Sequence, residues 1–164
     1  MTDDIDYDYI AYTDGSCNNL SPYGEGGAAY IILDPDRRVV RKSSKGFIGT
    51  TNNRMELIAI MSALAAVPPN SKLLVYTDSQ YCIMMLGNRR SPIKKNAKNL
   101  DLISRCIFYK ERLSGVDFEW VKGHNGNEYN ELADALAASR TEEMRLIHGI
   151  PEYNRINSPK VKKQ

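Results

Sequence analysis

Apolar positions in the first third of the chain form short runs, each bounded by turn residues. Residues 9–13 and 28–33 are almost continuously apolar, and a third run begins at Val39 and leads towards Ile48. Glycine, proline, asparagine and aspartate are concentrated in the two connections between these runs, where tight turns favour them. The pattern predicts an antiparallel meander of three strands.

The hydrophobic period changes after residue 50. Apolar residues from 55 to 67 occupy most sides of a helix, which predicts a largely buried helix that stops at Pro68. Residues 51–53 offer an N-cap, and Glu56 is expected in the first turn, where a carboxylate suits the helix dipole.

Strands and helices alternate in the rest of the chain. An apolar run at 73–77 predicts a strand, and a short helix is expected from 79 to 87. The later elements are a helix with a stripe of Leu102, Cys106, Tyr109 and Leu113, a strand at 116–121, and a helix from 128 to 146. Strands first, then strands alternating with helices, predict an α/β fold with a mixed sheet and helices on its faces.

The size and composition are those of one soluble domain. The chain has 164 residues, of which 42% are hydrophobic and 26% charged, enough to bury a core. No apolar run approaches the length of a membrane helix, and the acidic first residues do not resemble a signal peptide. Three widely spaced cysteines form no Cys-x-x-Cys pair. We therefore expect a reduced, cytoplasmic protein without a structural zinc site.

Charge is unevenly distributed along the chain. The net charge of +2 is too small to argue for a nucleic-acid ligand. Cations gather without acids in the middle and near the end, as Arg89, Arg90, Lys94, Lys95, Lys98, Lys160, Lys162 and Lys163. The middle group is equally compatible with a solvated face and with phosphate binding. Because hydrophobic periodicity ends at Gly149, we expect a domain at 1–148 and a loose basic tail at 149–164.

Two apolar runs have the same ending. Tyr-Thr precedes both Asp14 and Asp78, and a carboxylate at the end of a buried strand loses solvation unless it has a partner. Turn chemistry is the alternative at Asp14, because aspartate followed by Gly15 is a common turn pair. If both acids end strands, they lie at one edge of the sheet, where sites form in open α/β sheets.

Two acids on helices could reach the same edge. One is Glu56, and the other is Asp134, which shares a helix face with Asn130, apart from the apolar seam of Leu132 and Leu136. Four carboxylates in one site need compensating charge. Oxygen ligands without a histidine or cysteine cluster favour Mg²⁺ or Mn²⁺. Two such ions about 4 Å apart suit displacement at phosphate.

The motifs around these acids resemble, in sequence and order, those of the type 1 ribonuclease H (ribonuclease HI) family. They are Tyr-Thr-Asp14-Gly-Ser-Cys, Thr-Thr-Asn-Asn-Arg-Met-Glu56-Leu, Tyr-Thr-Asp78-Ser-Gln-Tyr, Trp-Val-Lys-Gly-His124 and Asn130-Glu-Leu-Ala-Asp134. The resemblance implies a ribonuclease H-like five-stranded mixed sheet, with two parallel strands added to the meander. It also implies a monomeric endonuclease that cuts the RNA strand of RNA–DNA hybrids and leaves 5′-phosphate and 3′-hydroxyl ends.

The resemblance further implies roles for individual residues. Asp14 would bridge two metal ions, and Glu56 would hold one of them and sense the neighbouring 2′-hydroxyl. Asp78 would ligate the ion that activates water, and Asp134 the ion on the leaving-group side. His124 would assist proton transfer or product release. Without the acids, His124 would be interpreted as a plain loop histidine.

Substrate contacts are also implied. Asn52, Asn53 and Gln80 would read the 2′-hydroxyl and the minor groove, while Thr51 and Asn99 would hold a phosphate of the DNA strand. Helix capping is the alternative for the two asparagines, and both roles can hold together.

The chain departs from the family pattern in two places. Gly49 stands where many relatives have an arginine, two residues before the phosphate-pocket threonine, and the stretch from 78 to 101 is too short for a basic, tryptophan-rich protrusion. We therefore expect weaker hybrid binding, with help from the lysines of the tail. Trp120 is expected in the core, and His148 is expected to be structural.

Other functions on the same fold remain open from sequence. A non-catalytic RNA- or hybrid-binding module would be expected to lose at least one acid, and none is lost here. An integrase or resolvase would lack the Asn-Asn-Arg-Met-Glu helix start and the Gly-His loop. A detached reverse-transcriptase domain would have the same chemistry.

Overall fold

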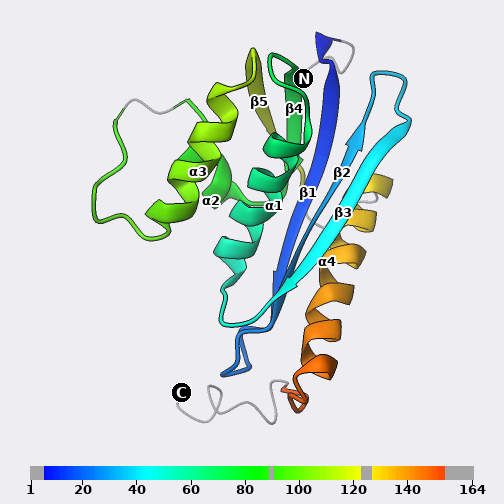
Figure 1. Ribbon diagram of the computed structural model, residues 1–164, viewed down its shortest axis with the longest axis vertical. Coiled ribbons are helices and arrows are strands. Elements are labelled where there is room, and N and C mark those ends of the chain that lie inside the picture. Colours follow the sequence, from blue (N-terminus) through cyan, green and yellow to red (C-terminus); the bar gives the residue numbers. More distant parts are fainter. Residues whose placement is uncertain (1–5, 89–90, 123–126, 154–164) are drawn as a thin grey trace.

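The computed structural model describes residues 6–88, 91–122 and 127–153. Figure 1 shows the elements in chain order: β1 (Tyr9–Cys17), β2 (Gly26–Leu33), β3 (Val39–Phe47), α1 (Asn52–Ala66), β4 (Lys72–Thr77), α2 (Gln80–Leu86), α3 (Leu100–Glu111), β5 (Gly115–Trp120) and α4 (Glu128–Ile147). Within the described ranges, no helix is both long and apolar enough to cross a membrane.

The strands form one sheet in the order β3-β2-β1-β4-β5. β1 pairs with β2 and β2 with β3 in antiparallel fashion, whereas β4 is parallel to both β1 and β5. This arrangement confirms the predicted five-stranded mixed sheet, in which two parallel strands extend an antiparallel meander.

Helices cover both faces of the central strands. Ala11 and Val75 belong to a core with residues of α1 and α3. Their neighbours Ile10 and Leu74 belong to a second core, with Ala133 of α4. Because side chains alternate between the two faces of a strand, α1 and α4 lie on opposite faces. Burial on both sides explains the unbroken apolar runs within β1, β2 and β4.

Several boundaries differ from the expectations. β1 does not end at Asp14 but continues to Cys17, because Asp14 pairs with Ala29 and the following residues stay paired with β2. β2 therefore begins at Gly26, two residues earlier than expected. α3 ends at Glu111, so Leu113 belongs to the core but not to the helix.

The buried seam of α4 consists of small residues. Ala133 and Ala137 are fully buried, whereas the expected seam residues Leu132 and Leu136 are only partly buried. The reason is close packing on the sheet, because a Cβ atom at Gly27 would stand 2.3 Å from the Ala137 carbonyl oxygen. Only small side chains fit beneath a helix at this distance, and the leucines flank the contact.

The start of the expected tail is packed. Ile150 is 5% exposed, and its N–H donates to the Arg145 carbonyl oxygen at 2.9 Å. Ile150 is therefore packed against the domain, whereas residues 154–164 lie outside the described residues and the expected tail stays a prediction.

Candidate active site

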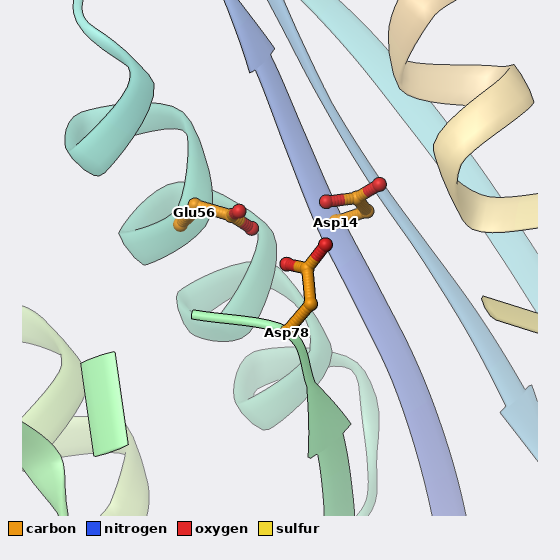
Figure 2. A group of neighbouring side chains, drawn as sticks. All are labelled: Asp14, Glu56 and Asp78. Atoms are coloured by element: carbon orange, nitrogen blue, oxygen red, sulfur yellow. The ribbon is translucent and has the colours of Figure 1, made fainter. Parts of the chain in front are cut away.

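Three carboxylates from three different elements meet at one place. Asp14 projects from β1, Glu56 from α1, and Asp78 from the residue after β4, and Figure 2 shows them facing one another. Each offers an oxygen that lies within 4.8 Å of the oxygens of the other two. Asp14 is 3% exposed and Glu56 5% exposed, so the group is largely removed from water.

The parallel register places Asp14 beside Asp78. Tyr12 and Tyr76 are paired across β1 and β4, and each acid follows its tyrosine by two residues. The two acids therefore lie at the same level of the sheet, although only Asp78 follows the end of its strand. Ser79 then caps α2 by accepting a bond from the Cys82 N–H at 3.1 Å, which turns the chain away from the acids.

Gly15 brings α1 close enough for Glu56 to join them. A Cβ atom at Gly15 would lie 2.4 Å from the backbone nitrogen of Glu56 and 2.5 Å from the carbonyl carbon of Met55. Such distances are far below van der Waals contact, so only glycine allows this approach. The turn interpretation of Gly15 is wrong, since the residue lies inside β1.

Glu56 occupies a different helical position from the one expected. Thr51 is the N-cap of α1, and its hydroxyl accepts a bond from the Arg54 N–H at 3.2 Å. The first turn of α1 contains no acid, so Glu56 lies in the second turn. Its place is set by the contact with β1 rather than by the helix dipole.

Asp134 approaches the cluster from the opposite face of the sheet. It lies on α4, whose N-terminus is capped by the side chain of Asn127. Asp134 lies near enough to Asp14 to contribute to the raised pKa of the Asp14 carboxyl. Asp134 is not part of the three-residue cluster itself. The structure thus brings three of the four predicted acids into one cluster, and Asp134 lies near Asp14 beside it.

Burial and mutual repulsion disfavour the charged forms of these acids. Desolvation, followed by the charge of Asp78 and by the hydrogen bond and charge of Asp134, raises the pKa of Asp14 to about 8. Desolvation, with the charges of Asp14 and Asp78, also raises the pKa of Glu56 well above its ordinary value. A bound cation would reverse both effects.

Two oxygens in the cluster lack protein donors. Among the described residues, neither Oε1 of Glu56 nor Oδ1 of Asp78 has a hydrogen-bond partner, although both atoms are buried. Buried acceptors of this kind need a donor or a cation. Hard divalent cations prefer oxygen ligands, so the residues present fit such an ion.

The predicted substrate residues lie at the starts of three helices. Thr51, Asn52, Asn53 and Gln80 are exposed at the N-termini of α1 and α2. Thr51 provides the cap of α1, so the capping alternative for the two asparagines is wrong. Asn99 precedes α3 in a left-handed conformation, with φ 61°.

Arg54 holds Asn99 in place, a role that was missed from sequence. Its guanidinium donates to both carboxylate oxygens of Asp101, at 3.1 and 2.9 Å, and to Oδ1 of Asn99 at 3.3 Å. Asn99 in turn donates to the hydroxyl of Tyr81 at 3.0 Å. These contacts join the N-terminal regions of α1, α2 and α3. No sequence motif could have predicted these contacts, because the partners are up to 47 residues apart in the chain.

Two further predicted residues have different outcomes. His124 lies outside the described residues, so its role stays a prediction. The expectation that Trp120 belongs to the core is wrong, because the residue is 48% exposed. Its indole N–H donates to the Asp78 carbonyl oxygen at 3.3 Å. Trp120 is the last residue of β5, so this bond links the end of that strand to the backbone of one of the acids.

Comparisons with known proteins agree with this geometry. The family model described as RNase H matches residues 6–142. Ribonuclease H of Chromobacterium violaceum is 36% identical over 142 residues, 81% of this chain and 94% of that protein. Ribonuclease H of Jannaschia sp. is 41% identical over 140 residues, 79% of this chain and 88% of that protein.

A solved structure has the same fold. It is the N-terminal RNase H domain of a Mycobacterium tuberculosis protein, determined as a fusion with maltose-binding protein. The TM-score is 0.71 at 20% sequence identity, over 87% of this chain and 99% of that one.

Proposed function

Because the chain belongs to the ribonuclease H family, we propose that its four clustered acids hydrolyse the RNA strand of RNA–DNA hybrids with two divalent metal ions. The protein is an endoribonuclease that acts on such hybrids. The observation that carries the assignment of the site is the meeting of Asp14, Glu56 and Asp78 within 4.8 Å. Two of these acids are buried, and two oxygens of the group lack donors among the described residues.

The oxygen-only donor set favours Mg²⁺, with Mn²⁺ as a substitute. Asp14, Glu56, Asp78 and Asp134 would hold the ions. When bound, the ions would activate a water molecule and stabilise the leaving oxygen, which leaves a 5′-phosphate and a 3′-hydroxyl. Asp14 is near both Asp78 and Asp134, whose charges contribute to its raised pKa, and this supports its proposed role as a ligand shared by the two ions.

The chain's own residues prepare this site. Burial raises the pKa of both Asp14 and Glu56, which favours their protonated forms while no cation is present. Cation binding therefore releases protons. Trp120 holds the peptide carbonyl of Asp78, and Gly15 keeps α1 against β1.

Substrate contacts are proposed for the residues around the helix starts. The exposed residues there are Thr51, Asn52, Asn53 and Gln80. Arg54 orients Asn99 through a hydrogen bond to its side chain. His124 is proposed to assist proton transfer. We also propose that the enzyme works as a monomer in the cytoplasm. All four acids come from one chain, and none of its three cysteines is in a disulfide.

The test is a cleavage assay with an RNA–DNA hybrid labelled on the RNA strand. The hybrid is incubated with Mg²⁺, Mn²⁺ or EDTA, beside single-stranded RNA and duplex DNA of the same sequence. We expect metal-dependent cuts in the hybrid alone, and loss of cleavage in Asp14→Asn. Asp36→Asn, which changes an exposed acid of the β2–β3 turn, is the matched control. Cleavage in EDTA, or full activity of Asp14→Asn, would contradict the metal assignment.

A further inference from the structure

An arginine occupies the turn between β2 and β3 at a position that favours glycine. The Arg37 N–H donates to the Asp34 carbonyl oxygen at 2.9 Å, and the Asp34 N–H donates to the Arg38 carbonyl oxygen at 3.0 Å. These bonds define a short hairpin loop that ends on a left-handed residue, for which glycine is the usual choice. Among the described residues with a positive φ, Arg37, at 64°, is alone in being neither glycine nor asparagine. Because this conformation strains a residue with a long side chain, the contacts of Arg37 must offset the strain.

Those contacts are with two tyrosines. The Nη2 atom of Arg37 donates to the hydroxyl of Tyr12 at 3.0 Å, and its guanidinium carbon lies 5.4 Å from the centroid of the Tyr129 ring. The Arg37 carbonyl oxygen accepts a bond from the Tyr129 hydroxyl at 3.3 Å. Tyr12 belongs to β1 and is 2% exposed, whereas Tyr129 lies in the first turn of α4. Arg37 therefore holds the start of α4 against the central strand of the sheet.

The same tyrosines connect α4 to both strands that lead to the acids. The ring of Tyr12 is stacked on that of Tyr76 in β4, with centroids 4.7 Å apart and planes inclined by 11°. The rings of Tyr12 and Tyr129 are 5.5 Å apart. Contacts between rings, and between a cation and a ring face, are attractive. Since Tyr12 and Tyr76 precede Asp14 and Asp78 by two residues each, this group of side chains lies next to the acids.

The spacing along both elements relates this contact to Asp134. Asp14 follows Tyr12 by two residues, which is about 7 Å along a strand. Asp134 follows Tyr129 by five residues, a rise of about 7.5 Å along a helix. Figure 1 shows α4 running beside the sheet in the same direction as β1. The contact between Tyr12 and Tyr129 therefore helps to set the position of Asp134 relative to Asp14.

The position of Asp134 depends on how its helix is held. Asp134 is outside the cluster of three acids, so it reaches a shared ion only if α4 is correctly placed. Beyond Asp134, the helix is fixed by the close approach of Ala137 to Gly27. Before it, the first turn of a helix lacks part of the hydrogen bonds of a helix interior and opens easily. Arg37 supports α4 at this weaker end.

From these observations we propose that Arg37 is a positioning residue of the active site. By holding the first turn of α4 through Tyr129, it keeps Asp134 where it can bind a divalent cation together with Asp14. Arg37 itself touches neither the ion nor the substrate. The inference rests on the proposed function, because it takes Asp134 as a metal ligand.

The test uses a substitution that suits the turn but removes the contacts of the guanidinium. Asparagine adopts the left-handed conformation more readily than arginine, so Arg37→Asn should leave the turn intact. Its melting temperature in EDTA should be close to that of the native protein, because relief of strain offsets the lost contacts. Arg38→Asn removes the same charge from the next residue, which is exposed, and is the matched control.

Mn²⁺ binding to the full chain, followed by electron paramagnetic resonance without substrate, is the main measurement. We expect Arg37→Asn to raise the dissociation constant of Mn²⁺ about fivefold, the effect of losing one hydrogen bond. The Mg²⁺ concentration for half-maximal cleavage should rise by a similar factor, with KM for the hybrid unchanged at saturating Mg²⁺. Arg38→Asn should alter none of these values. Native Mn²⁺ affinity in Arg37→Asn, or an equal loss in Arg38→Asn, would overturn the proposal.

A second set of variants tests whether Arg37 acts through Tyr129. Tyr129→Leu removes both the ring and the hydroxyl, so adding Arg37→Asn to it should weaken Mn²⁺ binding no further. Arg37→Lys keeps a cation near the rings and should recover part of the affinity. Fully additive losses in the double variant would refute the action through Tyr129.

Asp134→Asn separates this inference from the proposed function. If Asp134→Asn weakens Mn²⁺ binding and Arg37→Asn does not, the positioning role fails while the metal assignment stands. If both variants weaken it, the positioning role is supported even where no hybrid is cleaved. If neither does, Asp134 is not a ligand, and the inference fails with that assignment.

Discussion

Replacing Asp14 by asparagine should stabilise the metal-free protein while it abolishes cleavage. Asp14 is 3% exposed, and desolvation together with Asp78 and Asp134 raises its pKa from 3.8 to about 8. Asparagine has almost the same shape and carries no charge. Its Oδ1 can still accept the bond from the Gly15 N–H, which is 2.9 Å long in the native chain.

The effect has a definite pH dependence. Below the ordinary pKa of 3.8, Asp14 is protonated in both the folded and the unfolded chain and contributes nothing. Between 3.8 and about 8, the unfolded chain releases a proton that the folded chain retains, so stability falls as the pH rises. The loss is at most about 1.4 kcal/mol per pH unit, or about 4 kcal/mol at neutral pH. Because the charges of the neighbouring acids contribute to the shift of the Asp14 pKa, we expect a smaller loss of stability, about 2 kcal/mol.

Urea unfolding in EDTA, followed near pH 4 and near pH 8, measures this difference. The variant and the native protein should have similar unfolding free energies at the lower pH, and the variant should be more stable at the higher one. Asp36→Asn, at an exposed position, should change neither value. Added Mg²⁺ should stabilise the native protein more than the variant. A stability difference that does not grow with pH would refute the argument that burial of the ionised Asp14 carboxylate destabilises the folded protein.

Three other substitutions test the architecture of the site. Gly15→Ala should cost about 3 kcal/mol or more in unfolding free energy and most of the activity, because its Cβ would collide with α1; an unchanged melting temperature would contradict the close approach. Arg54→Lys should raise KM about fivefold with little change in kcat, since lysine cannot reproduce the bidentate fork that orients Asn99; Lys42→Gln, at an exposed position of β3, is its control, and an equal loss in kcat would contradict a positioning role. Trp120→Phe should lower kcat a few-fold and increase the Mg²⁺ concentration needed for half-maximal rate, because the bond to the Asp78 carbonyl is worth about 1 kcal/mol. A normal Mg²⁺ dependence in Trp120→Phe would refute that role.

The repeated Tyr-Thr-Asp ending was sufficient to predict the shared location of Asp14 and Asp78. Parallel strands with one register place equivalent residues at one level, and the Tyr12–Tyr76 pair does so here. The mixed sheet followed from the change between strand and helix periodicity, which is a local property of the chain. Both inferences needed only the order of apolar and polar positions.

The tertiary structure alone decided how closely the elements approach one another. The Asp14–Gly15 pair is typical of a turn in sequence. In the structure Gly15 instead allows the backbones of β1 and α1 to come into close contact. Trp120 alternates like a core residue but lies where the sheet ends, and Ile150 is buried although its segment has no periodicity. Periodicity shows which face of an element is apolar. It does not show which distant segment covers that face, and that contact raises the pKa of Asp14 through burial.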